Sequence, residues 1–328
     1  MFDFVCPPTY DIDWFSTTGK LILFGIVFVV GGILLLLLPK KNKKAIQISK
    51  ISIAVVLSAL EIGRIVWYYL RHLQYGDIFN VWIRINFHMC TIMVWANVLT
   101  LLLSTFLKKD NKVLCALYNI TFGIGIFGAI MTFVYPEFID PLFAIWNFRN
   151  SQTIFTHILL IVTPIYLLLT KHFKIEIKNL WYNAMGLLLV GNISSLAGAC
   201  ANFNFAYCFY CNFLTSIGIN IDFPYYIWFL FLVILLIDYL VYFMFEIVRA
   251  KRQHKKLCFK FSKFDIFGTI TTFIFVIIHA FVMQAILPNA PTNLGWLFLV
   301  PMSIYLAIIV FLNYYLNSQK LNKPNKSL

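Results

Sequence analysis

Residues 84–107 read RINFHMCTIMVWANVLTLLLSTFL, and this stretch indicates both the class of fold and the place of a candidate site. It is apolar over most of its length and long enough, as a helix, to cross a bilayer, which takes about 20 residues. Asn86, His88 and Cys90 lie near its start, where we expect them inside the membrane. Such groups are costly to insert into lipid, so each needs a partner or a function.

The composition is that of an integral membrane protein. Of the 328 residues, 61% are hydrophobic and 12% are charged, and the mean hydropathy is +0.83. Soluble domains contain about 25% charged residues, so a soluble fold is excluded. The sequence predicts an all-α polytopic bundle of about nine transmembrane helices, near residues 21–39, 51–70, 84–107, 113–135, 153–170, 180–200, 224–248, 264–287 and 294–316.

The basic residues are divided unevenly between the two sides of this bundle. The net charge is +13, and 21 of the 26 Lys and Arg residues follow the odd-numbered runs, with Lys20, Arg71, Arg84 and Arg149 on the other side. Because cytoplasmic loops carry the excess of positive charge, we expect the N-terminus outside and the C-terminus in the cytoplasm. The charge then reflects the topology of a multi-pass cell-membrane protein, and no nucleic-acid partner is expected.

Seven polar or ionisable groups fall inside the predicted helices: Glu61, Arg64, His88, Cys90, His157, Asp238 and His279. Glu61 and Arg64 are three residues apart, share a helix face and are expected to pair. That pair has a structural interpretation, as two charges that neutralise one another. It also has a functional one, in which Glu61 orients an imidazole or Arg64 holds a lipid phosphate.

Depth in the membrane brings four of these groups together. At about 1.5 Å per residue, His88, Cys90 and His157 lie about 6 to 9 Å below the outer face, and Arg64 lies at about 10 Å. Residues two apart do not face each other on a regular helix, so His157 is the expected base for Cys90, with His279 as a deeper competitor. A thiol beside an imidazole suits acyl transfer through a thioester.

Amide side chains complete the predicted site. Asn86 and Asn97 are expected on the same helix face as Cys90, and Asn86, Asn192 or Asn202 can donate a hydrogen bond to a developing oxyanion. The structural alternative is that Cys90 is a small buried hydrophobe. The seven cysteines have no repeated spacing, so neither a metal site nor a disulfide framework is predicted, and Cys208 and Cys211 form a C-x-x-C without a second ligand pair.

Phe87-His88-Met89-Cys90 resembles the H-L-C motif that opens a membrane helix in the YwaF-like integral membrane family. The resemblance covers roughly residues 50–245. The chain has Ile85-Asn86-Phe87 where the family often has a Pro-rich lead-in. Further matching segments are Glu61 with Trp67-Tyr68, Gly128 to Tyr135-Pro136, Phe148 to His157, and the Asn-rich segment with Asn183, Asn192 and Asn202.

The family includes eukaryotic acyltransferases that act on ether phospholipids with a Cys nucleophile and a His, and more distant relatives hydrolyse fatty-acid esters with a Thr and a His. The resemblance implies Cys90 as the nucleophile, His157 as the base and His88 as a supporting residue. It also implies a membrane phospholipid or fatty-acyl lipid as the substrate and no cofactor. We expect three parts: an anchor (1–50), a six-helix core with the site (51–248) and a C-terminal part (249–328).

Three hypotheses remain open. The first is a lipid acyltransferase that works from the outer leaflet. A lipid hydrolase that uses the same residues is a variant of this first hypothesis. The second is a transporter or lipid-handling protein in which Glu61, Arg64, Asp238 and His279 line a path. The third is a structural membrane protein whose polar groups only hold helices together.

Overall fold

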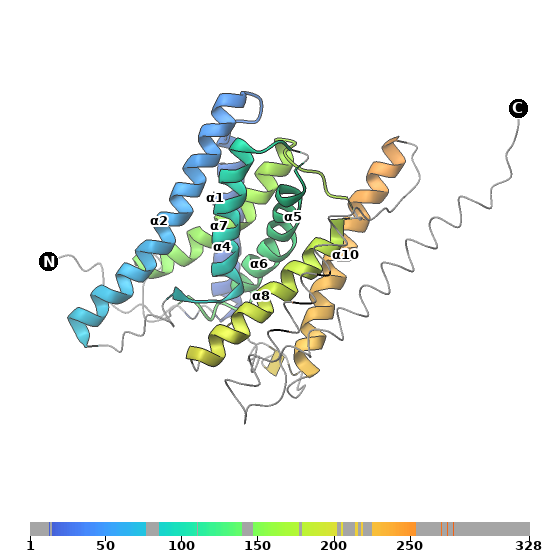
Figure 1. Ribbon diagram of the computed structural model, residues 1–328. Coiled ribbons are helices and arrows are strands. Elements are labelled where there is room, and N and C mark those ends of the chain that lie inside the picture. The colour runs from blue at the N-terminus through green and yellow to red at the C-terminus, as the bar shows by residue number, and fades with distance from the viewer. Residues whose placement is uncertain are drawn as a thin grey trace, which may run out of the picture. The chain divides into compact units, whose positions relative to one another are not determined.

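The chain forms two compact units, Met1–Lys174 and Ile175–Leu328, shown as a ribbon in Figure 1. This computed structural model describes residues 13, 15–76, 85–109, 111–139, 147–176, 179–201 and 225–253, with a few isolated residues between and after them. All of the regular elements in these ranges are helices. The predicted all-α class is therefore confirmed for this part of the chain.

The first unit contains helices α1 (Thr17–Leu37), α2 (Lys43–Tyr75), α4 (Met89–Phe106), α5 (Lys112–Ile120), the π-helical turn η1 (Thr121–Gly125), α6 (Ile126–Val134) and α7 (Phe148–Leu169). Helices α5, η1 and α6 follow one another without a gap and make a single span. In Figure 1, α2 and α4 run side by side. Helix α7 packs against α1, α2, α4 and α6, and so forms the centre of the unit.

Polar caps explain where several of these helices begin. The side chain of Asn42 accepts hydrogen bonds from the first turn of α2, and Asn111 and Asn147 do the same for α5 and α7. An Asn cap satisfies backbone N–H groups that have no acceptor within the helix. Asn111 stands just before its predicted apolar run, whereas the caps Asn42 and Asn147 start α2 and α7 several residues before the runs 51–70 and 153–170.

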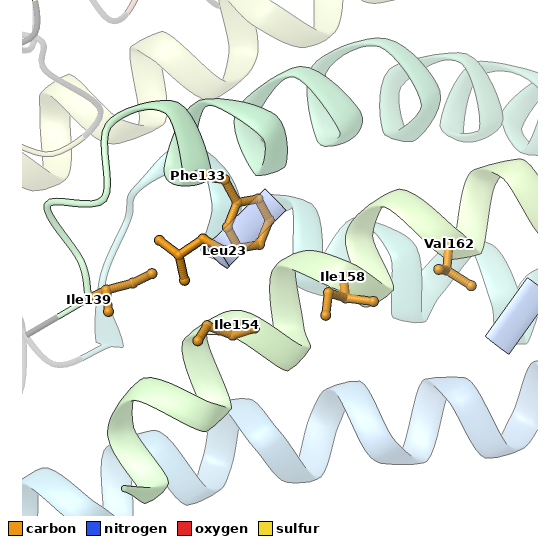
Figure 2. Packing of buried hydrophobic residues seen from close by; sticks show 6 residues of the cluster. All are labelled: Leu23, Phe133, Ile139, Ile154, Ile158 and Val162. Atoms are coloured by element: carbon orange, nitrogen blue, oxygen red, sulfur yellow. The ribbon is translucent and has the colours of Figure 1, made fainter. Parts of the chain in front are cut away.

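An apolar cluster packs α7 against α1 and α6, as Figure 2 shows. Its buried members are Leu23, Phe133, Ile139, Ile154, Ile158 and Val162. Glycines allow other helices to approach closely. A Cβ on Gly128 would lie 3.4 Å from Met89 Sδ and 3.5 Å from Cys90 Sγ. The Gly123–Gly128 segment therefore brings the fourth span, made of α5, η1 and α6, against α4, as its small residues indicate.

The second unit contains α8 (Leu180–Ala201) and α10 (Tyr225–Gln253), which pack against each other. A buried hydrogen bond joins them, from Asn183 Nδ2 to Asp238 Oδ2 at 3.2 Å. Asp238, which the sequence placed deep in the membrane, thus has a polar partner. An aspartate in an apolar interior needs such a donor.

Six helices in the described ranges are long and apolar enough to cross a membrane: Thr17–Leu37, Lys43–Tyr75, Met89–Phe106, Lys112–Val134, Phe148–Leu169 and Leu180–Gly198. They correspond to the first six predicted runs, and α10 corresponds to the seventh. Predicted runs 264–287 and 294–316 lie almost entirely outside the described residues. Three helix starts differ from the prediction by five residues or more. Helix α4 begins at Met89 rather than near residue 84, and α2 and α7 begin at Lys43 and Phe148, before the predicted runs 51–70 and 153–170.

Candidate functional site

A cavity of about 40 Å³ lies in the first unit, between the second half of α2 and the starts of α4 and α7. Six residues predicted for the site line it: Glu61, Arg64, Asn86, His88, Cys90 and His157. A cavity of this volume holds water or a small polar group. It is far smaller than the roughly 300–1,000 Å³ of sites that enclose whole ligands.

The segment before α4 is a turn rather than a helix. Asn86 has a positive φ of 57°, in the left-handed region that Asn tolerates better than most residues. Its side-chain Oδ1 accepts a hydrogen bond from the backbone N–H of His88 at 3.0 Å. His88 is the extended N-cap of α4, and its ring meets that of Phe138 edge to face at 4.9 Å. The assumption of a regular helix through His88, with Asn86 on the face of Cys90, is therefore wrong.

Cys90 lies in the first turn of α4, where the helix terminus favours negative charge. Its side chain is a free thiol. The sulfur lies 3.6 Å from the carbonyl oxygen of Gly128 and 3.8 Å from the hydroxyl of Thr132, both on α6. The thiol therefore donates towards α6 in this conformation, while its side chain also borders the cavity.

His157 is held in one orientation by its own helix. Its Nδ1 lies 2.6 Å from the carbonyl oxygen of Thr153, and because a carbonyl only accepts, we assign the proton to Nδ1. This leaves Nε2 as an acceptor. Nε2 is buried and has no hydrogen-bond partner in the described part of the chain, and the residue is only 6% exposed. A buried acceptor without a donor is unfavourable, so this atom points to a proton-donating ligand.

Cys90 and His157 border the same cavity but are not bonded to each other. The thiol contacts Gly128 and Thr132, and His157 Nε2 has no partner among the described groups. Catalytic hydrogen bonds are often long or misaligned without substrate. The arrangement therefore brings the predicted nucleophile and base to one site without forming a closed pair.

Glu61 and Arg64 form the predicted ion pair. Arg64 Nη2 lies 2.5 Å from Glu61 Oε1, and Nε lies 3.1 Å and 3.3 Å from the two carboxylate oxygens. Both residues are buried. Arg64 Nη2 also lies 3.4 Å from the carbonyl oxygen of Ile85. The pair is neutral overall and connects α2 to the turn before α4.

A comparison with known families identifies the chain. The model described as the TMEM164 family matches residues 14–245, more than two thirds of the chain. The protein belongs to the TMEM164 family. No curated protein and no solved structure matches it.

The part matched to the TMEM164 family contains every residue of the cavity. One of them, Arg149, was not predicted for the site, because as an outer-side Arg it counted only toward topology. It is the second residue of α7 and donates to Tyr68, Gln152 and Thr153. The signal was present in the sequence: Arg149, Thr153 and His157 follow a four-residue spacing, which places them along one side of a helix.

Other predicted residues of this TMEM164 family member lie elsewhere. Asn97 is fully buried in α4 and does not line the cavity; its Nδ2 donates to the carbonyl oxygen of Met93 at 2.9 Å. Asn192 lies on α8 in the second unit, where its Nδ2 donates to Leu188 at 2.7 Å. Asn202 and His279 fall outside the described residues, as do Cys208 and Cys211. Within the described ranges, no group of three or more His, Cys, Asp or Glu residues is placed to hold a metal ion.

Proposed function

We propose that this member of the TMEM164 family is an integral membrane lipid acyltransferase that carries a fatty acyl chain on Cys90 Sγ. The observation that supports this most directly is His157. Its buried Nε2 lacks a partner, its Nδ1 is fixed on Thr153, and it shares a small cavity with a free thiol. A neutral imidazole oriented in this way is suited to accept a proton.

The reaction has two halves. In the first, the Cys90 thiol gives its proton to His157 Nε2, and the thiolate attacks the ester carbonyl carbon of a donor lipid. The ester C–O bond breaks, and the leaving oxygen takes the proton from His157, so that a thioester and a lysolipid form. In the second, an acceptor hydroxyl gives its proton to His157 and attacks the thioester. The C–S bond breaks, and Cys90 recovers the proton.

The first half requires the sulfur to turn away from α6. The contacts of Cys90 with Gly128 and Thr132, at 3.6 and 3.8 Å, are long and weak, so a change of rotamer costs little. His88, as the N-cap of α4, borders the same cavity and supports the turn that positions the thiol. The start of α4 favours the thiolate that forms during the reaction.

The topology predicted from the charges places this site near the outer leaflet. Lys50 Nζ lies 2.8 Å from the carbonyl oxygen of Ser104 and 3.3 Å from His172 Nε2, at the opposite ends of α2, α4 and α7 from the cavity. Lys50 and Arg64 are 14 residues apart on α2, about 21 Å along the helix. If the basic end is cytoplasmic, the cavity lies on the outer side of the cell membrane, in a protein of nine spans.

Hydrolysis is the second candidate function, and the size of the cavity favours it. A volume of about 40 Å³ has room for water, and water in place of the acceptor hydroxyl would release a fatty acid from the same thioester. Measuring both products, acylated acceptor and free fatty acid, separates the two reactions. A lipid-handling protein without covalent chemistry would yield neither product.

The test is metabolic labelling with an alkyne fatty acid, followed by capture of the full-length protein and treatment with neutral hydroxylamine. Wild type should carry a label that hydroxylamine removes, and Cys90→Ala should not. Cys115→Ala is the matched control, because Cys115 is also a free cysteine but does not line the cavity. Equal labelling of wild type and Cys90→Ala would exclude Cys90 as the acyl carrier.

A further inference from the structure

Arg149 lines the cavity and has no part in the proton transfers proposed above. Its Nε donates to the hydroxyl of Tyr68 at 2.9 Å, and its guanidinium lies over the Tyr68 ring, 5.5 Å from the centroid. Its Nη1 donates to Gln152 Oε1 at 3.3 Å and also to the hydroxyl of Thr153. These contacts hold the guanidinium in place from both α2 and α7.

All of these partners are neutral. The ion pair between Arg64 and Glu61 accounts for the one carboxylate that borders the cavity, and no carboxylate in the described ranges pairs with Arg149. Its Nη2 nitrogen donates to no acceptor in the same ranges, although it carries two N–H groups. Among the described groups around the cavity, the positive charge of Arg149 therefore has no counter-ion, and the two N–H groups of its Nη2 have no acceptor.

An oxyanion is the ligand that fits such a group. Arg binds phosphate and carboxylate through charge-assisted hydrogen bonds that are about twice as strong as neutral ones. The small cavity accepts a polar head but not an acyl chain. A phosphate fits the chemistry better than a fatty carboxylate, because a phospholipid also carries an ester for Cys90 to attack, whereas a free fatty acid has none.

The order of groups along α7 gives the ligand a direction. Arg149 is at the start of the helix, and His157 lies eight residues further, about 12 Å along the axis. Thr153 lies between them, accepting from Arg149 at its hydroxyl and from His157 at its carbonyl oxygen. A headgroup at Arg149 thus places the glycerol esters deeper, on the side of His157.

We propose that Arg149 binds the phosphate of a glycerophospholipid substrate and so holds its ester region beside Cys90 and His157. This rests on the proposed function for the identity of the ligand as a substrate. Binding itself requires no reaction, so it is tested on the full-length Cys90→Ala protein. Loss of acyl labelling and loss of headgroup binding are then separate results.

The experiment compares the affinity of purified full-length Cys90→Ala for lysophosphatidylcholine and for a monoacylglycerol with the same chain, which lacks the phosphate. Adding Arg149→Gln should weaken lysophosphatidylcholine binding by about 10- to 100-fold, the usual effect of a hydrogen bond to a charged group, and leave the monoacylglycerol unchanged. Arg149→Lys keeps the charge and should recover part of the loss. Arg71→Gln is the matched control, since Arg71 stacks on Trp67 of α2 and does not line the cavity.

Three outcomes would overturn the proposal. Equal affinities in Arg149→Gln and Arg71→Gln would show that Arg149 binds no headgroup. Equal weakening of both lipids would show a structural role only. If inorganic phosphate bound in an Arg149-dependent way and lysophosphatidylcholine did not, the site would be for free phosphate rather than lipid. Thermal unfolding of each variant, including Arg149→Lys, separates binding losses from misfolding.

Discussion

Gly63 allows α2 to pack closely against the first residue of α7, so Gly63→Ala tests that contact directly. A Cβ built on Gly63 would lie 2.9 Å from Phe148 Cζ, whereas ordinary contacts begin at 3.4 Å. The Phe148 ring must therefore retreat by about 0.5 Å, and it packs against the buried Trp67. Overpacking of this kind costs about 1–3 kcal/mol, and we expect a loss of stability in that range.

The assay is reversible unfolding in mixed micelles for wild type, Gly63→Ala, Phe148→Leu and the double variant. Residues in contact show coupling energies of about 0.5–3 kcal/mol, so Phe148→Leu should relieve part of the cost of Gly63→Ala. Gly32→Ala is the control, because nothing lies within 4 Å of its Cβ position and Ala favours a helix interior by about 0.5–1 kcal/mol. Additive effects of the two substitutions would refute this packing of α2 against α7.

Three further predictions follow from other contacts. Gly128→Val should slow alkylation of Cys90 by maleimide at least tenfold while Gly32→Val leaves it unchanged, because the Cβ position of Gly128 already lies 3.5 Å from Cys90 Sγ; equal rates would contradict the packing of α6 against α4. Asn183→Ala should destabilise the protein by about 1–3 kcal/mol, the cost of leaving a buried polar group unpaired, because Asp238 loses its donor; thermal unfolding checks this, and the further change Asp238→Ala should recover part of the loss. Burial and the nearby Lys50 and Lys109 lower the pKa of His172 to about 4. Since the unfolded chain binds this proton near pH 6.5, stability should fall from pH 6.5 towards pH 4, and less steeply in His172→Gln, as melting temperatures across that range will show.

Hydrophobicity alone predicts the helices that the structure describes, because a chain in lipid must satisfy its backbone groups within each segment. The run 153–170 became α7, Phe148–Leu169, which starts earlier because polar residues at its first turn are buried by other helices. The start of α4 could not be predicted in this way. It depends on one Asn in the left-handed region and on a side-chain-to-backbone bond, and neither contributes to hydropathy.

The candidate site was partly predictable for a similar reason. Depth along neighbouring helices placed Arg64, His88, Cys90 and His157 in one layer, and these four border one cavity. The depth of a residue in the membrane does not determine to which side of the helix its side chain points. Asn97, assigned to the site by its spacing from Cys90, instead contacts its own helix backbone.

The irregular turn before α4 is tolerated because it borders the cavity, and the cavity in turn depends on the space that the turn leaves. Backbone that is not helical is tolerated at membrane depth only where protein covers it or a polar cavity receives it. Residues 86–88 meet this condition, since Asn86 and His88 border the cavity and Asn86 satisfies the N–H of His88. In a continuous helix through this segment, these N–H groups would donate to carbonyl oxygens of the preceding turn. Interrupting the helix instead leaves the N–H groups in the first turn of α4, where Cys90 lies, without acceptors inside the helix, at an end that favours negative charge. The break in the helix thus brings the first turn of α4, with the Cys90 thiol that we propose as the acyl carrier, to the edge of the cavity.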